Sequence, residues 1–126
     1  MPMERQRKTR VLVIDDDKLL LREIQDTLSL NDYDVVAMNH PADATEVIER
    51  VQPDVILLDL VMPDESGFQV ACKINYFSGL ARIPIIAMTG YFKDSYLPLM
   101  SGYGIKDYLK KPFDPLELIA KIESVV

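Results

Sequence analysis

Three aspartates in this chain follow short apolar runs at positions where their carboxylates could act together. The run Val11–Ile14 is followed directly by Asp15 and Asp16, and the run Val55–Leu58 is followed by Asp59. Carboxylates held at one spot repel one another, and they protonate or move apart unless a cation joins them. Oxygen ligands select a hard ion, and Mg²⁺ suits a few carboxylates together with water and a phosphoryl oxygen. If the two runs are neighbouring strands, these residues predict a magnesium site.

Asp59 and two later segments offer the groups that phosphoryl transfer requires. A carboxylate at the centre of such a cluster can attack phosphorus and form an aspartyl phosphate. The transfer depends on positioning and charge neutralisation more than on proton chemistry. Thr89, at the end of another apolar run, can donate a hydrogen bond to a phosphoryl oxygen, and Lys110 or Lys111 can balance its charge. These residue types therefore predict acceptance of a phosphoryl group on Asp59.

Each of these residues also has an ordinary explanation when it is taken alone. Asp17 is expected to be a helix N-cap, and Thr89 could be a simple strand or turn residue. Lys110 and Lys111 could simply be solvated. Asp59 is harder to explain in this way, because it follows four apolar residues that predict a buried strand, and a buried charge needs compensation. The functional interpretation therefore depends on the residues acting as a set.

Apolar patterns predict the elements that would carry these residues. Five short runs predict strands over Val11–Ile14, Val35–Met38, Val55–Leu58, Ile83–Met88 and Ile105–Leu109. Helical spacing gives apolar stripes at Leu20, Leu21, Ile24 and Leu28; at Ala44, Val47, Ile48 and Val51; at Val70, Ile74 and Phe77; and at Leu118, Ile119, Ile122 and Val126. A further, weaker helix is expected over residues 93–101.

This alternation predicts a doubly wound, flavodoxin-like α/β fold with a five-stranded parallel sheet and five helices. Runs that are apolar on successive residues indicate strands that are covered on both faces. Right-handed crossovers leave few arrangements, and the common order for five strands is 2-1-3-4-5. Ligands in such sheets bind beyond the carboxyl ends of the strands, where the strand order reverses between the first and third strands. The acidic segments follow these two strands.

Local signals predict where three of the helices begin or break. The segment Asp114–Glu117 combines a carboxylate cap, a proline at the first helical position and a glutamate three residues after the cap. The pair His40 and Pro41 is expected to open the second helix in a similar way. Pro98 lies inside the expected fourth helix, and a mid-helix proline costs on the order of 3 kcal/mol. That helix is expected to be short, kinked or mobile.

Composition and charge exclude several classes of function. The chain has a formal charge of −6 and contains 48% apolar and 27% charged residues, as an ordinary globular domain does. Residues 1–10 carry four cations and one anion, a balance of +3, which leaves −9 for the remainder. Because an acidic body cannot neutralise phosphates, we expect no direct nucleic-acid binding. Residues 1–8 are expected to be a basic solvated tail, with contact to DNA or lipid as the alternative, and residues 9–126 to be one domain.

The sequence also indicates a compartment. Its apolar stretches are too short to span a bilayer, and no signal-peptide core follows the basic start, so no membrane association is expected. The single cysteine, Cys72, can form no internal disulfide, which favours a reducing cytoplasm. Cys72 itself is expected to be a packed thiol.

Four motifs, in this order and at this spacing, resemble the receiver domain of two-component response regulators, the CheY-like family. They are Val13–Asp17, Asp59–Gly67, Met88–Gly90 and Gly104–Phe113, and the resemblance covers residues 9–126. Each motif alone is weak, because acidic pairs and lysine-proline steps are common. Together they imply a signalling phosphoacceptor rather than a turnover enzyme, with self-catalysed phosphotransfer and slow autodephosphorylation as its only chemistry.

The resemblance implies a role for each residue of the predicted metal site. Asp59 would be the phosphoacceptor, which takes its phosphoryl group from a sensor histidine kinase or a histidine phosphotransfer protein. Asp16 would be the direct Mg²⁺ ligand, and Asp15 would hold the ion through water. Val61, two residues after the acceptor, would supply a backbone carbonyl to the metal.

The resemblance also implies a switch. Thr89 would be the hydroxyl switch residue, Lys111 the cation beside the phosphoryl group, and Tyr108 the aromatic side chain that turns inward when Thr89 moves. These movements would bias a surface made by the fourth helix, the fifth strand and the fifth helix toward a downstream effector. Pro98 and Ile105 depart from the family pattern on that surface. Whether phosphorylation also drives homodimerisation stays open.

Two bulky residues suggest a long-lived phosphoryl group. In the family, the positions of Val61 and Tyr91 tune dephosphorylation. An apolar and a large aromatic side chain there would hinder the attack of water. We therefore expect slower hydrolysis than in fast chemotaxis regulators.

Two other classes of function are weighed against this interpretation. A hydrolase that passes through an aspartyl phosphate would use Asp15 as nucleophile and Asp17 as its partner, but no segment remains for a cap domain, and Asp59 would have no role. An interaction domain that has lost its chemistry would lack the acceptor, an acidic partner or the lysine, and all are present here. Whether the domain acts alone or as part of a longer protein stays open.

Overall fold

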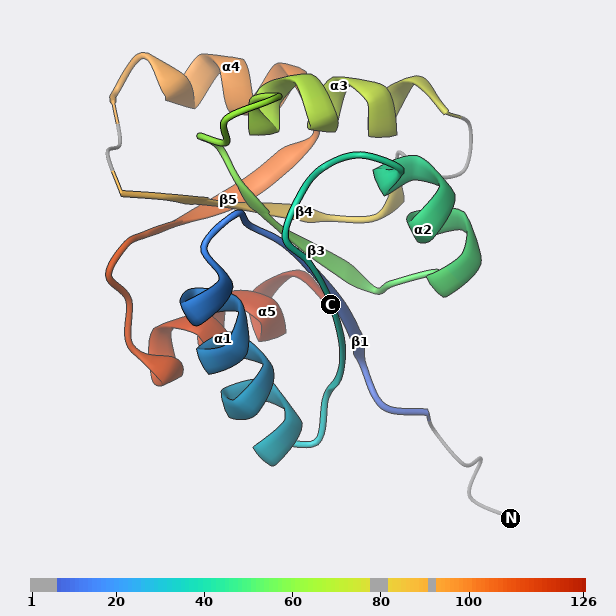
Figure 1. Cartoon of the computed structure of the whole chain (residues 1–126). Helices are drawn as coiled ribbons and strands as arrows, with labels where there is room; N and C mark the ends of the chain where they lie inside the picture. The colour runs from blue at the N-terminus through green and yellow to red at the C-terminus, as the bar shows by residue number, and fades with distance from the viewer. Residues whose placement is uncertain (1–6, 78–81, 91–92) are drawn as a thin grey trace, which may run out of the picture.

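Strands and helices alternate along the whole described chain (Figure 1). The computed structural model describes residues 7–77, 82–90 and 93–126. The strands are β1 Arg10–Ile14, β2 Asp34–Met38, β3 Val55–Asp59, β4 Ile85–Thr89 and β5 Ile105–Lys110. The helices are α1 Lys18–Leu30, α2 Ala44–Val51, α3 Gly67–Tyr76, α4 Tyr96–Gly102 and α5 Pro115–Val125. Every predicted element is present, with small shifts at the ends, and Tyr91 lies outside the described residues.

The strands form one sheet in the order β2-β1-β3-β4-β5, with all neighbours parallel. This confirms the doubly wound, flavodoxin-like arrangement of five strands and five helices. The strand order reverses between β1 and β3, and the acidic residues that follow these strands therefore meet at one edge of the sheet.

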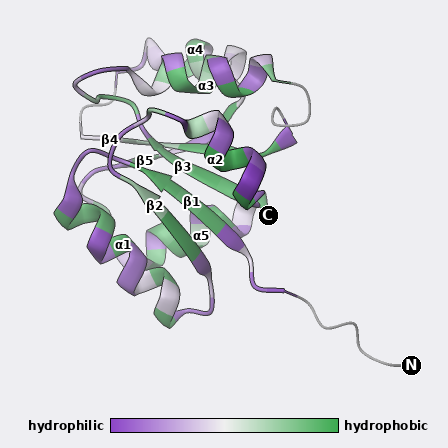
Figure 2. Ribbon diagram, turned by 45° about the vertical axis from the view of Figure 1, so that its right-hand side comes forward, coloured by the Kyte–Doolittle hydropathy of each residue, from purple (hydrophilic) through white to green (hydrophobic). Residues whose placement is uncertain are grey.

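Helices cover both faces of the sheet, because alternate residues of each strand point to opposite sides. Leu12 and Ile14 of β1 join a core under α2, α3 and α4, whereas Val11 and Val13 join a second core under α1 and α5. Figure 2 shows the hydrophobic strands enclosed between helices that carry hydrophilic residues outward. Among the described residues, none of the helices is long and apolar enough to cross a membrane.

The predicted caps of α1 and α5 are confirmed. The carboxylate of Asp17 accepts hydrogen bonds from the N–H groups of Leu19 and Leu20, each at 3.1 Å. The carboxylate of Asp114 accepts one from the N–H of Glu117 at 2.9 Å, with Pro115 at the first position of α5. Such caps satisfy N–H groups that a helix terminus leaves without a partner. The cap at Asp17 therefore fixes the start of α1 directly after Asp15 and Asp16.

The expected start of α2 at His40 and Pro41 is wrong. A turn follows Pro41, in which the N–H of Ala44 donates to the Pro41 carbonyl at 3.2 Å. Asp43, the residue before the helix, has a positive φ of 62°, a conformation that Asp tolerates better than most residues. The helix therefore begins only at Ala44, and His40 stays exposed in the loop between β2 and α2.

The expectation of a short α4 is confirmed, but the reason given for it is wrong. The helix has 7 residues and begins at Tyr96, so Pro98 lies in its first turn. Backbone N–H groups of a first turn have no partner inside the helix, and a proline there removes no hydrogen bond. The N–H of Tyr96 instead donates to the Lys93 carbonyl in the preceding turn, at 2.9 Å.

Three expectations of burial near helix ends and on α3 are also wrong. Phe77 follows the last residue of α3 in extended backbone and is 44% exposed. Val126 follows α5 and is 57% exposed. Cys72, expected to be a packed thiol, is exposed on α3. The helical period predicts which face is apolar, but the face is buried only as far as the helix continues over the sheet.

The two ends of the described chain lie together at the amino edge of the sheet. The guanidinium of Arg7 donates to both carboxylate oxygens of Asp54 at 2.7 and 2.8 Å, and Asp54 also accepts the N–H of Arg10 at 2.8 Å. Burial opposes ionisation of Asp54, but these hydrogen bonds outweigh it and hold the pKa of its carboxyl below the usual value. Val126 lines the same hollow as Arg7 and Asp54. Both ends therefore lie on the side opposite to the acidic residues.

Candidate functional site

Three carboxylates from two strands meet where the strand order reverses. Asp15 and Asp16 follow β1, and Asp59 is the last residue of β3. One carboxylate oxygen from each residue lies within 4.8 Å of the other two, which is close enough for a single metal ion. Asp15 is fully buried and Asp59 is 4% exposed, whereas Asp16 is exposed. The site is therefore open to solvent on the side of Asp16. We call these three residues the acidic pocket.

Three hydrogen bonds hold Asp15 in place. Its Oδ1 accepts the backbone N–H of Asp17 at 2.9 Å, and its Oδ2 accepts a hydrogen bond from Lys111 Nζ at 2.6 Å. Its own backbone N–H donates to the carbonyl of Met38, at the end of β2, at 3.1 Å. A fully buried carboxylate needs such partners, because an isolated buried charge is very costly. These hydrogen bonds therefore fix the position of the Asp15 carboxylate in the acidic pocket.

Lys111 reaches two of the three carboxylates. Its Nζ lies 2.6 Å from Asp15 Oδ2 and 3.6 Å from Asp59 Oδ1. The backbone N–H of Lys111 donates to the Thr89 carbonyl at 2.7 Å, which holds the chain in place just after β5. Lys110, in contrast, is exposed. The structure thus places Lys111 in the site and Lys110 outside it, a choice that residue types alone had left open.

The surroundings of Asp59 raise its pKa to about 7. Burial is the largest cause, and the nearby charge of Asp15 and a side-chain contact with Asp16 act in the same direction. The ammonium of Lys111 and the backbone N–H of Val61, which lies 3.2 Å from Asp59 Oδ1, lower the pKa but do not compensate. One lysine is therefore insufficient for the acidic pocket, and a bound dication would supply the missing positive charge.

Hard oxygen ligands and an open side are the features that a small divalent cation requires. The three carboxylates present only oxygen atoms, and Asp16 leaves room for water on the exposed side. Mg²⁺ keeps several waters and is typically bound by one or two carboxylates plus phosphate oxygens. Val61 is 66% exposed next to Asp59, so its backbone lies at the rim of the pocket. The residues present therefore fit a metal ion of this class.

Thr89 and Tyr108 lie on the same face of the sheet. Thr89 is fully buried at the end of β4 and is paired in register with Lys110 of β5. Tyr108 precedes Lys110 by two residues, and side chains two apart in a strand share a face. The Tyr108 ring is half-buried against the core under α3 and α4, and Lys121 Nζ lies 5.9 Å from its centroid. The two predicted switch residues are thus diagonal neighbours on adjacent strands.

Gly67 allows α3 to approach the loop that follows Asp59. Its N–H donates to the Leu60 carbonyl at 3.0 Å, and a Cβ at this position would lie 2.8 Å from the Leu60 Cα, in severe conflict with the backbone. Ser66 caps the helix in a capping box with Gln69, in which the Gln69 N–H donates to Ser66 Oγ at 3.2 Å. Gly67 and the capping box therefore set how closely α3 approaches the loop that follows Asp59.

One contact that supports the site has no signal in the sequence. The Met38 carbonyl that accepts the Asp15 N–H is a backbone group, so any residue type at position 38 could provide it. Only the register of β2 against β1, which pairs Ile14 with Met38, brings it into place.

Comparisons with known proteins agree with this geometry. Residues 11–123 match the family described as the response regulator receiver domain. Response regulator MprA of Mycobacterium leprae (strain TN) is 34% identical over 119 residues, which cover 93% of this chain and 50% of that protein. Transcriptional regulatory protein GltR of Pseudomonas aeruginosa is 30% identical over 116 residues, which cover 92% of this chain and 48% of that protein. The chain thus spans about half the length of these curated relatives.

Solved structures are similar over nearly the whole chain. The BeF3-activated N-terminal receiver domain of Klebsiella pneumoniae RstA is 28% identical with a TM-score of 0.81, covering 92% of this chain and 97% of that one. Chemotaxis protein CheY4 of Vibrio cholerae is 24% identical with a TM-score of 0.90, covering 94% of this chain and 99% of that one, and this likeness shows the fold alone. The matched region includes every residue of the acidic pocket.

Proposed function

The chain belongs to the response regulator receiver domain family of two-component systems, and we propose that it accepts a phosphoryl group on Asp59 in a Mg²⁺-dependent reaction. The observation that carries the proposal is the acidic pocket itself, three carboxylates within 4.8 Å of one another beside the Lys111 ammonium. Ordinary structural roles account for single aspartates, but they do not account for three that meet at one place, two of them beside the same lysine.

The reaction would proceed by in-line transfer. A carboxylate oxygen of Asp59 attacks phosphorus, and the bond to a histidine nitrogen of the donor breaks, so that the nitrogen keeps the electron pair. The family acts with histidine kinases and output domains, and a sensor kinase or a histidine phosphotransfer protein would be the donor here. Because the acceptor must be ionised, anything that lowers the pKa of Asp59 favours attack.

Four groups would hold the Mg²⁺ ion: the carboxylates of Asp15, Asp16 and Asp59 and the backbone carbonyl of Val61. When bound, the ion supplies positive charge to the transferring oxygens. The Lys111 ammonium would form an ion pair with the phosphoryl group on Asp59, since its Nζ already lies 3.6 Å from that carboxylate. The Thr89 hydroxyl would donate a hydrogen bond to a phosphoryl oxygen.

Movement of Thr89 would pass the signal to Tyr108. The two side chains share one face of the sheet, and Tyr108 borders the groove between α4 and β5 that Met100 and Ile105 also line. A shift of the ring would change the surface of α4, β5 and α5, to which an output domain or partner would respond. Homodimerisation through this surface after phosphorylation is part of the same proposal.

Cys72, the single cysteine, is free and exposed and favours a reducing cytoplasm as the place of these events.

The competing hydrolase interpretation has less support. It would require Asp17 as an acid or base beside Asp15. The Asp17 carboxylate instead accepts two backbone hydrogen bonds at the start of α1, which hold it in the role of a helix cap. Asp59, which that interpretation leaves unused, lies in surroundings that raise its pKa to about 7. Phosphoryl acceptance without turnover of a substrate therefore fits the contacts better.

Intact mass after treatment with acetyl phosphate tests the proposal. With Mg²⁺ present we expect one phosphoryl adduct that hydroxylamine removes, and none with EDTA. The Asp59→Asn variant should take up no phosphoryl group, whereas Asp64→Asn, an exposed aspartate of the following loop, should behave as the native chain does. An unmodified native protein with its fold intact, or an adduct that persists in Asp59→Asn, would contradict the proposal.

A further inference from the structure

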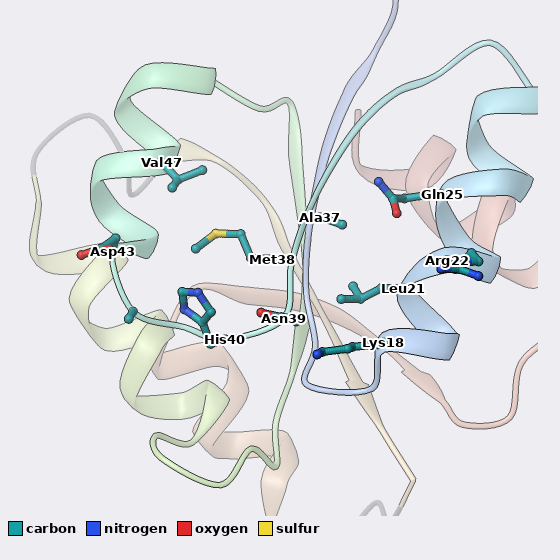
Figure 3. A pocket seen from close by; sticks show the side chains of 11 residues that line it. Lys18, Leu21, Arg22, Gln25, Ala37, Met38, Asn39, His40, Asp43 and Val47 are labelled. Atoms are coloured by element: carbon teal, nitrogen blue, oxygen red, sulfur yellow. The ribbon is translucent and has the colours of Figure 1, made fainter.

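A second concave site lies beside the acidic pocket, at the carboxyl end of β2 (Figure 3). It has a volume of about 490 Å³ and lies between the first turns of α1 and the loop that joins β2 to α2. Figure 3 shows Lys18 and Arg22 of α1 on one side of β2 and His40 on the other, with Asn39 between them. A volume of several hundred Å³ suits a small organic ligand. We call it the β2 site.

The β2 site gathers positive charge on an acidic protein. Lys18 and Arg22 line it, and Asp43 is the one acidic residue among the lining groups. The chain as a whole carries −6. A local excess of cations on such a surface attracts anions that the rest of the molecule repels.

The two cations are placed against the local electrostatics of their own helix. Lys18 is the first residue of α1, where the helix dipole disfavours positive charge, and no acidic residue occupies the first turn. Arg22 lies four residues later, so the two cations are neighbours on one side of the helix. Within the described part of the chain, neither forms an ion pair or a side-chain hydrogen bond. No ion pair among the described residues therefore accounts for the two cations, and their charge is available to an anion.

The remaining walls suit the body of an organic molecule. Asn39 and Gln25 offer side-chain amides, and Met38 and Val47 offer apolar surface. Among the residues that the structure describes, no strand pairs with the outer side of β2, so backbone groups there are available to a ligand. The combination of two cations, hydrogen-bonding amides and apolar contact resembles the surroundings that a phosphorylated heterocycle needs.

We infer that the β2 site binds a small phosphorylated organic molecule of about the size of a mononucleotide. Lys18 and Arg22 contact the phosphate, Arg22 as a planar fork and Lys18 as a point charge. Asn39, Met38 and Val47 contact the organic part. An acidic peptide would be attracted by the same cations, but the concave shape of the site favours a compact ligand over an extended chain.

Binding at the β2 site does not depend on Asp59. The two sites share one backbone contact, from the Asp15 N–H to the Met38 carbonyl, but no side chain that lines the β2 site belongs to the acidic pocket. An Asp59→Asn protein should therefore bind the ligand as the native protein does. Failure of the proposed phosphoryl chemistry and failure of the present inference are thus separate results.

Titration with AMP, followed by amide chemical shifts in metal-free buffer, tests the inference. We expect saturable shifts in residues 18–25 and 37–47, with a dissociation constant below about 1 mM. Adenosine, which lacks the phosphate, should bind about tenfold more weakly or not at all. Lys18→Gln and Arg22→Gln should each weaken AMP binding about tenfold. Lys106→Gln removes an exposed lysine from β5 and should leave it unchanged.

Several results would overturn the inference. These are no saturation up to about 1 mM AMP, equal affinity for adenosine and AMP, or equal weakening by Lys106→Gln. Shifts confined to the acidic pocket would show that the phosphate binds there instead. Tighter binding of an oligoglutamate peptide than of AMP would replace the small molecule by a protein partner. Thermal unfolding of each variant, expected to match that of the native chain, confirms that folding is unaffected.

Discussion

Lys111 Nζ lies closer to Asp15 than to Asp59, at 2.6 Å against 3.6 Å. The shortest cationic contact in the acidic pocket is therefore made to Asp15 and not to Asp59, the proposed phosphoacceptor. Asp15 is fully buried and needs this partner, whereas Asp59 is left with a raised pKa of about 7. Asp59, the proposed acceptor, thus lacks full compensation of its charge, and a bound metal ion would supply the missing positive charge.

Replacing Lys111 by Gln should destabilise the fold as well as the chemistry. The substitution leaves the buried Asp15 carboxylate without its ammonium partner, and breaking a buried ion pair in this way costs several kcal/mol. Because the Lys111 side chain is 21% exposed, we expect a smaller loss, of about 2 kcal/mol, in urea unfolding at pH 7. Lys110→Gln, in an exposed position, is the matched control and should change stability little. Equal losses in the two variants would show that Lys111 has no special role.

The raised pKa of Asp59 predicts a stability that falls with pH. The pKa of Asp59 is 3.8 in the unfolded state and about 7 in the folded state, so the folded state binds this proton more tightly. The free energy of unfolding of the metal-free protein should therefore decrease between these two pH values and level off above them. Asp59→Asn removes this group, so the difference in stability between the variant and the native chain should grow over the same range, to at least about 1 kcal/mol at pH 8. A difference that does not change with pH would contradict the raised pKa.

Magnesium affinity should rise with pH through the same region. In the proposed site the ion would bind the ionised carboxylate of Asp59, and in the metal-free protein this group is half protonated near a pH of about 7. Isothermal titration at pH 6 and pH 8 should show tighter binding at pH 8, by about tenfold, with proton release at the lower pH. Asp59→Asn should bind the ion more weakly and without this pH dependence. An equal affinity of the native protein at both pH values would argue against binding through Asp59.

Two glycines provide a matched pair for testing whether the loop that follows Asp59 needs the close approach of α3. Gly67→Ala places a Cβ 2.8 Å from the Leu60 Cα, and the backbone after Asp59 has to move. We expect a loss of about 2 kcal/mol or more and reduced phosphorylation. Gly102 of α4 has no atom within 4 Å of the corresponding position. Gly102→Ala should therefore be neutral or stabilise by up to about 1 kcal/mol, since alanine favours a helix. A native phosphorylation rate in Gly67→Ala would show that the loop tolerates the shift.

Val61 should slow the loss of the phosphoryl group. Its side chain is 66% exposed beside Asp59, where it can hinder an approaching water molecule but cannot activate one. Val61→Gln, with an amide that can hold water, should shorten the lifetime of the phosphorylated protein several-fold while leaving its formation unchanged. Decay of the intact-mass adduct over time measures this lifetime. A longer lifetime in the glutamine variant would contradict the proposed effect.

The features that were predictable from sequence are those that depend on local pattern. Apolar runs locate the strands, and the reversal between β1 and β3 brings Asp15 and Asp59 together, because parallel strands end at the same edge. The Asp17 and Asp114 caps were also predictable, since a carboxylate before a helical stripe has one common role. The types of the residues and their spacing along the chain were therefore sufficient to predict the fold and the meeting of the acidic residues.

The features that were not predictable depend on exact backbone geometry. The pairing of β4 with β5 shifts between Ile85 and Ile86, so that Ile85 pairs with Ile105 but Ile86 with Asp107. Such an irregularity changes which residues of a strand face the site, and alternation alone could not distinguish Lys111 from Lys110. The start of α2 was missed for a similar reason, because it depends on the positive φ of Asp43. Neither feature leaves a distinct pattern of residue types.

The hollow shared by Arg7, Asp54 and Val126 has a practical consequence. Both ends of the described chain emerge at the edge of the sheet that lies farthest from the acidic pocket. A tether attached at either end would therefore leave the pocket facing outward when the protein is immobilised on a solid support. The nearness of the two ends also means that they could be joined by a short linker and the chain reopened in a distant loop. Such a circular permutant would keep the three aspartates of the acidic pocket in place.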